Sequence, residues 1–270
     1  MITKTTLAVL CSAVLVTPAF AKGSAGFKTR FSEANASDTS SASGILSVTS
    51  SNAFDAASNY ANTAAWSTGS NGGTGFGTWT ITDGDGGHYI GGTGLGSNTF
   101  GLFNTFTTTT TDAVRALSGG TLAAGQTFSA DLGFTAFTGG SVGLNLRSGT
   151  NEVITLFTNG TGNWMLNDGG TDFDAGAAAT ANTPYTFTLT YNGGNSYSFT
   201  LTGSAGGLNF TSSDPGLATI DNVRFFDFNQ GAGQNFGFNN LAIVPEPSTL
   251  SLLAGPMLLG GWFFLRRRRA

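Results

Sequence analysis

Cysteine and histidine are almost absent from this 270-residue chain, and several kinds of chemistry are excluded with them. The single cysteine, Cys11, lies in an apolar N-terminal run that we interpret below as a signal peptide, so the mature chain is expected to form no disulfide. The single histidine, His88, would have to serve alone in a Ser-His-Asp triad, and the chain has no G-x-S-x-G motif. Zinc catalysis usually needs two or three His or Cys ligands. We therefore expect His88 to lie in an exposed turn and the protein not to be an enzyme.

Charged residues are scarce as well, at 10% of the chain, compared with about 25% in ordinary soluble domains. Between Lys22 and Val244 there are six basic and fourteen acidic residues, a net charge of −8. An acidic surface has no electrostatic attraction for nucleic acid. Glycine, in contrast, is abundant, with 41 residues. This composition indicates many short strands that are joined by tight turns.

The N-terminus has the pattern of a secretory signal peptide. A basic start at Lys4 is followed by an apolar run from Leu7 to Val16. Ala19-Phe20-Ala21 then fits the small-x-small cleavage pattern. The sequence therefore predicts a signal peptide over residues 1–21 and a mature chain that starts at Lys22.

The C-terminus has three consecutive parts, which together occupy residues 245–270. Pro245-Glu246-Pro247 is a stiff, extended segment, because each proline disfavours helix in the residue before it. Ser248 to Leu265 is a run of eighteen residues without charge, close to the minimum for crossing a bilayer. A basic block of Arg266, Arg267, Arg268 and Arg269 follows, and the positive-inside rule predicts that it stays in the cytoplasm. Residues 22–244 would then face outward.

This order of parts resembles the PEP-CTERM sorting signal. The resemblance implies that Pro245, Glu246 and Pro247 are the recognition motif of an exosortase, a membrane transpeptidase of exopolysaccharide-producing Gram-negative bacteria. Ser248–Leu265 would be the transmembrane span and Arg266–Arg269 the membrane stop. It also implies export through the inner membrane, anchoring there, and delivery to the cell surface or extracellular matrix.

Residues 22–244 form one predicted all-β ectodomain. In the segment 184–191, Tyr185, Phe187, Leu189 and Tyr191 alternate with threonines, and a second alternating run follows the turn Asn192–Asn195, which predicts a hairpin with one dry face. Residues 45–48 are a candidate first strand, and 52–66 a short helix or a loop. About twelve short strands separated by glycine-rich turns favour an antiparallel β-sandwich with jelly-roll connections; the further apolar strands are expected at 128–134, 142–146, 153–157, 164–166, 223–228 and 236–243.

The strand order and the closing strand at 236–243 resemble concanavalin-like and laminin-G-like domains. Concanavalin-like glucanases carry their acids as E-x-D-x-x-E on one strand. Here the ectodomain has only Glu33 and Glu152, far apart in the sequence. Hydrolysis of sugars by a carboxylate pair is therefore disfavoured.

Two groups of residues are candidates for ligand or metal binding. Trp66 and Trp79 bracket a glycine-rich loop, followed by Asp83 and Asp85. These indoles could stack on a sugar ring or could anchor the loop in the core. Calcium prefers oxygen ligands on flexible loops, but no EF-hand spacing is present and Asp-Gly pairs are also ordinary turns. The weaker metal candidates are Asp168, Asp172 and Asp174.

Two hypotheses for the ectodomain follow. The first is a non-enzymatic surface or matrix protein that needs no cofactor and is delivered by its sorting tail. The second is a lectin-like carbohydrate-binding module that associates with exopolysaccharide.

Overall fold

The protein is described by a computed structural model over residues 53–105, 108–137, 139–159, 162–169, 172–194, 196–203, 206–212, 219–229, 231 and 233–245. The signal peptide, the candidate strand at 45–48, the transmembrane span and the arginine block lie outside these residues, and of the sorting motif only Pro245 is included. Within the described ranges, none of the helices has the length and apolarity required to cross a bilayer.

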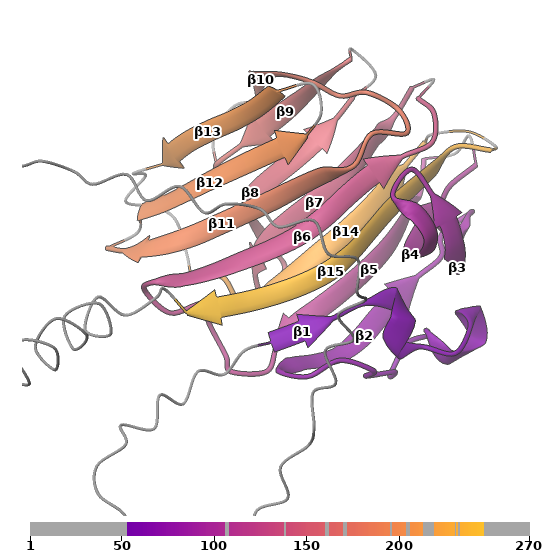
Figure 1. The fold of residues 1–270 in the computed structure, drawn as a ribbon, viewed down its shortest axis with the longest axis horizontal. Helices are drawn as coiled ribbons and strands as arrows, with labels where there is room; N and C mark the ends of the chain where they lie inside the picture. The colour runs from indigo at the N-terminus through magenta and orange to yellow at the C-terminus, as the bar shows by residue number, and fades with distance from the viewer. Residues whose placement is uncertain are drawn as a thin grey trace, which may run out of the picture. The chain divides into compact units, whose positions relative to one another are not determined.

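The described chain forms two antiparallel β-sheets (Figure 1). In the eight-stranded sheet, β1 (Ala53–Asp55) pairs with β15, and the other strands lie in the order β13 (Gly206–Ser212), β12 (Ser196–Gly203), β11 (Tyr185–Gly193), β6 (Gln126–Phe134), β15 (Asn235–Pro245), β4 (Gly96–Phe103) and β3 (Gly87–Thr93). The seven-stranded sheet has the order β10 (Phe173–Ala178), β9 (Asn163–Asn167), β8 (Asn151–Thr158), β7 (Ser141–Ser148), β14 (Asn222–Phe228), β5 (Thr110–Leu117) and β2 (Phe76–Thr82). The prediction of an all-β chain with antiparallel sheets is confirmed.

The hairpin formed by β11 and β12 has the predicted register and faces. Leu189 lies opposite Phe199, and Tyr191 opposite Tyr197, on either side of the glycine turn. The aromatic and leucine side chains point into the sandwich, and Thr188 and Thr200 hydrogen-bond to each other on the outer face at 2.7 Å. Local alternation therefore fixed both the pairing and the buried face of this hairpin.

The segment between β1 and β2 contains two short 3₁₀-helices, η1 (Ala57–Asn59) and η2 (Thr63–Ala65). The side chain of Asn62 accepts a hydrogen bond from the Ala65 N–H and so caps η2. Of the two alternatives for 52–66, the structure thus combines a loop with single helical turns. These turns pack Tyr60 and Trp66 into the core.

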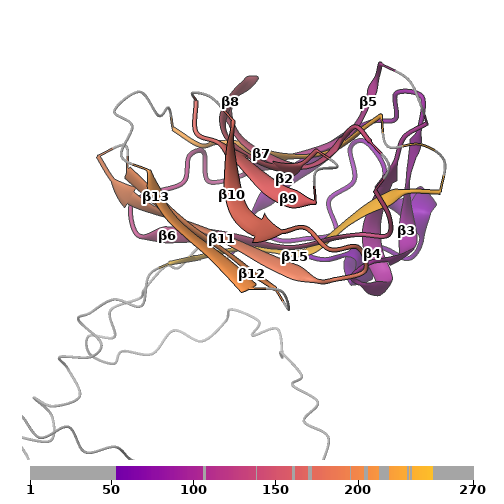
Figure 2. The same cartoon turned by 90° about the horizontal axis from the view of Figure 1, so that it is seen from above.

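The core lies between the two sheets and is rich in aromatic rings. Phe225 of β14 and Phe238 of β15 stack in parallel across the sandwich, with ring centroids 3.9 Å apart. Trp66, Trp79 and Phe100 pack around them. Figure 2 shows the seven-stranded sheet as a curved layer whose concave face points away from the eight-stranded sheet. That concave face is the part of the fold that holds the candidate site.

An acidic side chain without a basic partner lies buried between the sheets. Asp227 of β14 is fully buried, and neither carboxylate oxygen makes a hydrogen bond of good geometry. Burial raises the pKa of Asp227 to about 8, and the nearby backbone N–H of Phe236 opposes this rise. Burial, aided by the charge of Asp227, also raises the pKa of Tyr89 to about 12. The native state therefore favours the protonated, neutral form of Asp227.

Candidate functional site

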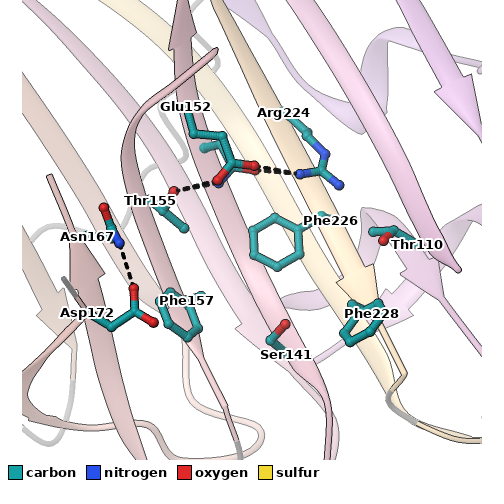
Figure 3. A pocket seen from close by; sticks show the side chains of 11 residues that line it. Thr110, Ser141, Glu152, Thr155, Phe157, Asn167, Asp172, Arg224, Phe226 and Phe228 are labelled. Carbon is teal, nitrogen blue, oxygen red and sulfur yellow. Dashed lines mark hydrogen bonds and ion pairs between the residues drawn. The ribbon is translucent and has the colours of Figure 1, made fainter. Parts of the chain in front are cut away.

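The outer face of the seven-stranded sheet carries an open hollow of about 270 Å³ (Figure 3). Along β14, Val223, Phe225 and Asp227 point into the core, so Arg224, Phe226 and Phe228 must point to the opposite face. Strands β5, β7, β8 and β9 and the loop after β9 supply the remaining lining residues, which are Thr110, Ser141, Asn145, Glu152, Thr155, Phe157, Asn167 and Asp172. The hollow is thus assembled from the outward positions of neighbouring strands.

Arg224 is held at one end of the hollow by two carboxylates. Its Nη1 lies 3.0 Å from Glu152 Oε1, and its Nη2 lies 2.8 Å from Asp112 Oδ1. The guanidinium also lies over the ring of Phe226, 5.2 Å from the centroid. Only 17% of the Arg224 side chain is exposed, whereas half of Glu152 is. The arginine is therefore a fixed part of the floor, and the glutamate is the part of the pair that a ligand can reach.

Asn145 ties this charged group to the next strand. Its Oδ1 accepts a hydrogen bond from Arg224 Nη1 at 2.9 Å, and its Nδ2 donates to Thr155 Oγ1 at 2.7 Å. Although it is on the outer face, Asn145 is buried beneath these neighbours. Burial raises the pKa of Asp112, and the charge of Arg224 opposes the rise. The polar end of the hollow is consequently a connected network, which restricts the rotamers of its members.

The other end of the hollow is aromatic. Figure 3 shows Phe157 and Phe228 on either side of Ser141, away from the Glu152–Arg224 pair, with Phe226 between the two ends. Gly143 lies opposite both Phe157 of β8 and Phe226 of β14 in the sheet register. A Cβ at Gly143 would overlap the carbonyl oxygen of Leu156 and approach the Phe157 Cα to 2.8 Å. Glycine at this position of β7 therefore permits the backbones of β7 and β8 to approach closely between the Phe157 and Phe226 rings.

A second carboxylate lies at the rim of the hollow. Asp172 is exposed, and its Oδ1 accepts a hydrogen bond from Asn167 Nδ2 at 2.7 Å. Together with Thr155, Ser141 and Thr110, these groups give the hollow several hydrogen-bonding side chains beside its aromatic rings. The hollow is therefore lined by eight polar or charged residues and three phenylalanines, which offer hydrogen bonds and apolar contact to a small polar ligand.

Trp66 and Trp79 do not line this hollow or any other surface. Both indoles are fully buried and meet edge to face, with centroids 5.7 Å apart. The hypothesis that they stack on a sugar ring does not fit this placement, because neither ring has a face open to solvent. The alternative, that they anchor the glycine-rich loop in the core, describes their position.

His88 and the two neighbouring aspartates form a local polar cluster at the turn before β3. His88 Nδ1 lies 2.6 Å from Asp83 Oδ1, and its ring packs edge-on against Trp66. The His88 side chain is only 19% exposed, so the expectation of an exposed turn histidine is wrong. Asp85 accepts a hydrogen bond from Thr109 Oγ1 at 2.8 Å. These contacts join the turn to the start of β5.

The three later aspartates are separated by their own contacts. Asp172 bonds to Asn167, and Asp174 Oδ2 accepts a hydrogen bond from Asn163 Nδ2 at 2.7 Å. Among the described residues, no three His, Cys, Asp or Glu side chains are grouped closely enough to hold a metal ion. Of the candidates chosen from the sequence, Asp172 alone lies in the hollow.

Sequence reasoning did not select Arg224, Asp112 or the phenylalanines of the hollow. A signal was present: in the expected strand 223–228, Arg224, Phe226 and Phe228 share one face. An arginine beside two aromatic residues on a face that should be wet indicates a surface with a specific role. The pattern could not reveal Glu152 and Asp112 as its partners, since they lie 72 and 112 positions away in the chain.

Comparisons with known protein families and with curated proteins found no match. Among solved structures, the binding domain of botulinum neurotoxin serotype D is similar at 15% identity and a TM-score of 0.43, over 63% of this chain and 43% of that one. A carbohydrate esterase from the Shiga toxin-encoding bacteriophage phi24B is similar at 16% identity and a TM-score of 0.43, over 62% of this chain and 90% of that one. The Caenorhabditis elegans galectin LEC-6 is similar at 15% identity and a TM-score of 0.32, over 53% of this chain and 94% of that one.

The chain spans less than half the length of the toxin domain that it matches. At these identities and TM-scores the similarities define no family for the chain. Its function must therefore be argued from its own side chains.

Proposed function

We propose that this protein is a non-enzymatic surface or extracellular-matrix protein whose β-sandwich binds a saccharide in the hollow of the seven-stranded sheet. The observation that carries the binding role is the pairing of a half-buried aromatic floor with a rigid polar network on one concave face. A sugar ring has C–H faces that pack on aromatic rings and hydroxyl groups that need hydrogen-bond partners. Phe157 and Phe228, which are partly exposed, supply the first kind of contact, and Thr155, Asn167 and Glu152 the second.

The size of the hollow suits a small part of a saccharide. Its volume of about 270 Å³ is slightly below the range of about 300–1,000 Å³ for small-molecule sites. One or two sugar rings of a longer chain would occupy it, and the open sides would let the rest of the chain continue over the sheet. Such a hollow would hold a polymer at one or two of its units, which is the role we propose for it in an exopolysaccharide matrix.

We propose that delivery depends on the PEP-CTERM tail, with an exosortase as the processing partner and the inner membrane as the first anchoring site. Pro245, where the sorting motif begins, ends β15 in the eight-stranded sheet. The hollow lies on the opposite sheet. Anchoring through the tail would therefore leave the hollow open to the outside.

We further propose that the sandwich is of the jelly-roll, concanavalin-like type. The strand order supports this proposal: β4, β5, β6 and β7 alternate between the two sheets, as do β13, β14 and β15. The runs β7–β10 and β11–β13 are, in contrast, neighbours in sequence and in space. Alternation of consecutive strands between two sheets is what jelly-roll winding produces.

Binding of the purified protein to a glycan array, with and without Ca²⁺, tests the saccharide proposal, and release of reducing sugar tests the absence of hydrolysis. Phe157→Ala should weaken binding about two- to twelvefold, because an aromatic contact contributes about 0.5–1.5 kcal/mol. Phe54→Ala is the matched control, since Phe54 is 45% exposed and belongs to the other sheet. Absence of binding to every glycan, or equal losses in the two variants, would refute the role of the hollow.

A further inference from the structure

The hollow has more negative than positive charge among its lining residues. Glu152 and Asp172 are both exposed carboxylates, and Arg224 is the one cation that lines it. Beyond the lining residues, Asp112 adds a carboxylate 2.8 Å from Nη2, and the charge of Arg147 on β7 acts on that carboxylate and opposes the rise in its pKa. A ligand that enters the hollow therefore meets carboxylates first.

Arg224 already uses three of its five N–H donors within the protein. Its Nη1 is engaged by both Asn145 Oδ1 and Glu152 Oε1, and its Nη2 by Asp112 Oδ1. Recognition of a carboxylate by arginine normally uses two parallel N–H donors. A carboxylated sugar that replaced Glu152 or Asp112 on the guanidinium would leave the displaced carboxylate close to the ligand charge.

We infer that the hollow selects neutral and amine-bearing saccharides and rejects those that carry carboxylates. This inference rests on the proposed function. A uronate or sialylated unit would bring its charge against Glu152 and Asp172, and among the described lining residues the one cation, Arg224, is already paired with two carboxylates. A protonated amino sugar would instead gain an ion pair with either exposed carboxylate, while a neutral sugar would use their oxygens as hydrogen-bond acceptors.

Two matched pairs of oligosaccharides, placed on an array with sialylated and neutral glycans, isolate the effect of charge. Oligogalacturonate and its methyl ester share one backbone, and chitosan and chitin oligomers share another. We expect the ester to bind more tightly than the acid, and the free amine more tightly than its N-acetyl form, each by about two- to fivefold at low salt. Both differences should shrink at 0.5 M salt, where the Debye length is only about 4 Å.

Substitutions assign the preference to the hollow. Asp172→Asn should reduce the advantage of the amine and of the ester by about twofold or more, because one carboxylate is removed from the rim. Asp131→Asn changes the net charge of the protein by the same amount but lies on β6 in the other sheet, so it should leave both ratios unchanged. Far-ultraviolet circular dichroism of the two variants checks that each retains its fold.

The outcomes separate this inference from the proposed function. Strongest binding to uronate or sialylated glycans, or equal shifts in the two variants, would overturn the charge selection and leave saccharide binding in place. Absence of signal from every glycan would refute the proposed function and the inference together.

Discussion

A buried ion pair joins the two sheets, and its removal should cost more stability than any other single change that we consider. Asp55 of β1 and Arg115 of β5 are both fully buried, with 3.0 Å between Asp55 Oδ2 and Arg115 Nη2. Asp55 also accepts hydrogen bonds from Tyr60 Oη at 3.0 Å and Trp79 Nε1 at 3.1 Å. Arg115 donates to Asn71 Oδ1 at 2.7 Å. The pair thus connects the N-terminal segment 53–79 to the middle of the sandwich.

Arg115→Met would leave the Asp55 carboxylate buried without its counter-charge. Breaking a buried pair in this way costs about 3–5 kcal/mol. The cation–π contact of Arg115 with Trp79, 4.8 Å from the ring centroid, would be lost as well. Against a total stability of about 5–15 kcal/mol for a typical domain, the loss is a large fraction. For a domain of this size it corresponds to a fall in Tm of about 6–20 °C.

Urea denaturation followed by tryptophan fluorescence measures the effect, since Trp79 is adjacent to the pair. The variants are Arg115→Met, Asp55→Asn, the double variant, and Asp131→Asn as a control on a partly exposed carboxylate. We expect each single change at the pair to cost about 3–5 kcal/mol and the double variant to cost less than their sum, because the second change removes the orphaned charge. A cost below about 1 kcal/mol for Arg115→Met would show that the pair does not hold the two sheets together.

Three further predictions follow from the sequence and the structure. The pKa of Asp227 is about 8 in the folded state and about 3.9 in the unfolded state, so the parent protein should lose stability as the pH rises between these values. The urea midpoint of Asp227→Asn should therefore rise relative to that of the parent from pH 5 to pH 8. A constant difference between the two midpoints would contradict the burial argument. Gly140 has a φ of +75°, and a Cβ there would overlap the Phe228 carbonyl, whereas Gly149 at +59° has open space. Gly140→Ala should therefore cost clearly more stability than Gly149→Ala, for which only the roughly 1–2 kcal/mol of left-handed strain is expected. Equal shifts in Tm for the two variants would show that the overlap with the Phe228 carbonyl has no cost. Replacing Pro245–Pro247 with alanine should leave membrane insertion intact and block processing, and neutralising Arg266–Arg269 should weaken retention in the membrane. Fractionation and immunoblotting measure both effects. Normal processing of the triple-alanine variant would mean that the tail is a plain anchor.

Much of the local structure could be predicted because the periodicity of a strand can be recognised within a short stretch of sequence. The alternation in 185–191 and 197–201 specified a hairpin, its turn and its dry face, and all three agree with β11 and β12. Phe128, Leu132 and Phe134 are buried in β6 for the same reason. A period of two needs no knowledge of distant residues, since successive side chains point to opposite faces of any strand.

The 52–66 segment and His88 could not be predicted at this level. Nothing local distinguishes single 3₁₀ turns from a loop in 52–66, because they are stabilised by packing of Tyr60 and Trp66 against distant strands. His88 follows a glycine-rich turn and would be exposed in an isolated chain. It is covered only because Trp66, 22 positions earlier, is brought against its ring.

The sequence by itself determined the strand-rich class, the acidic character and the targeting patterns predicted at both ends, because composition and periodicity are local properties. Only the tertiary structure decided which strands are neighbours, and therefore which side chains meet in the candidate site. Arg224, Asp112 and Glu152 meet because β5 and β7 flank β14, and β8 follows β7 in the same sheet. Tertiary packing likewise decided that Trp66 and Trp79 are buried and that three phenylalanines are left on the concave face. Pairing between distant strands depends on the free energy of the whole sandwich, which no short window of the sequence contains.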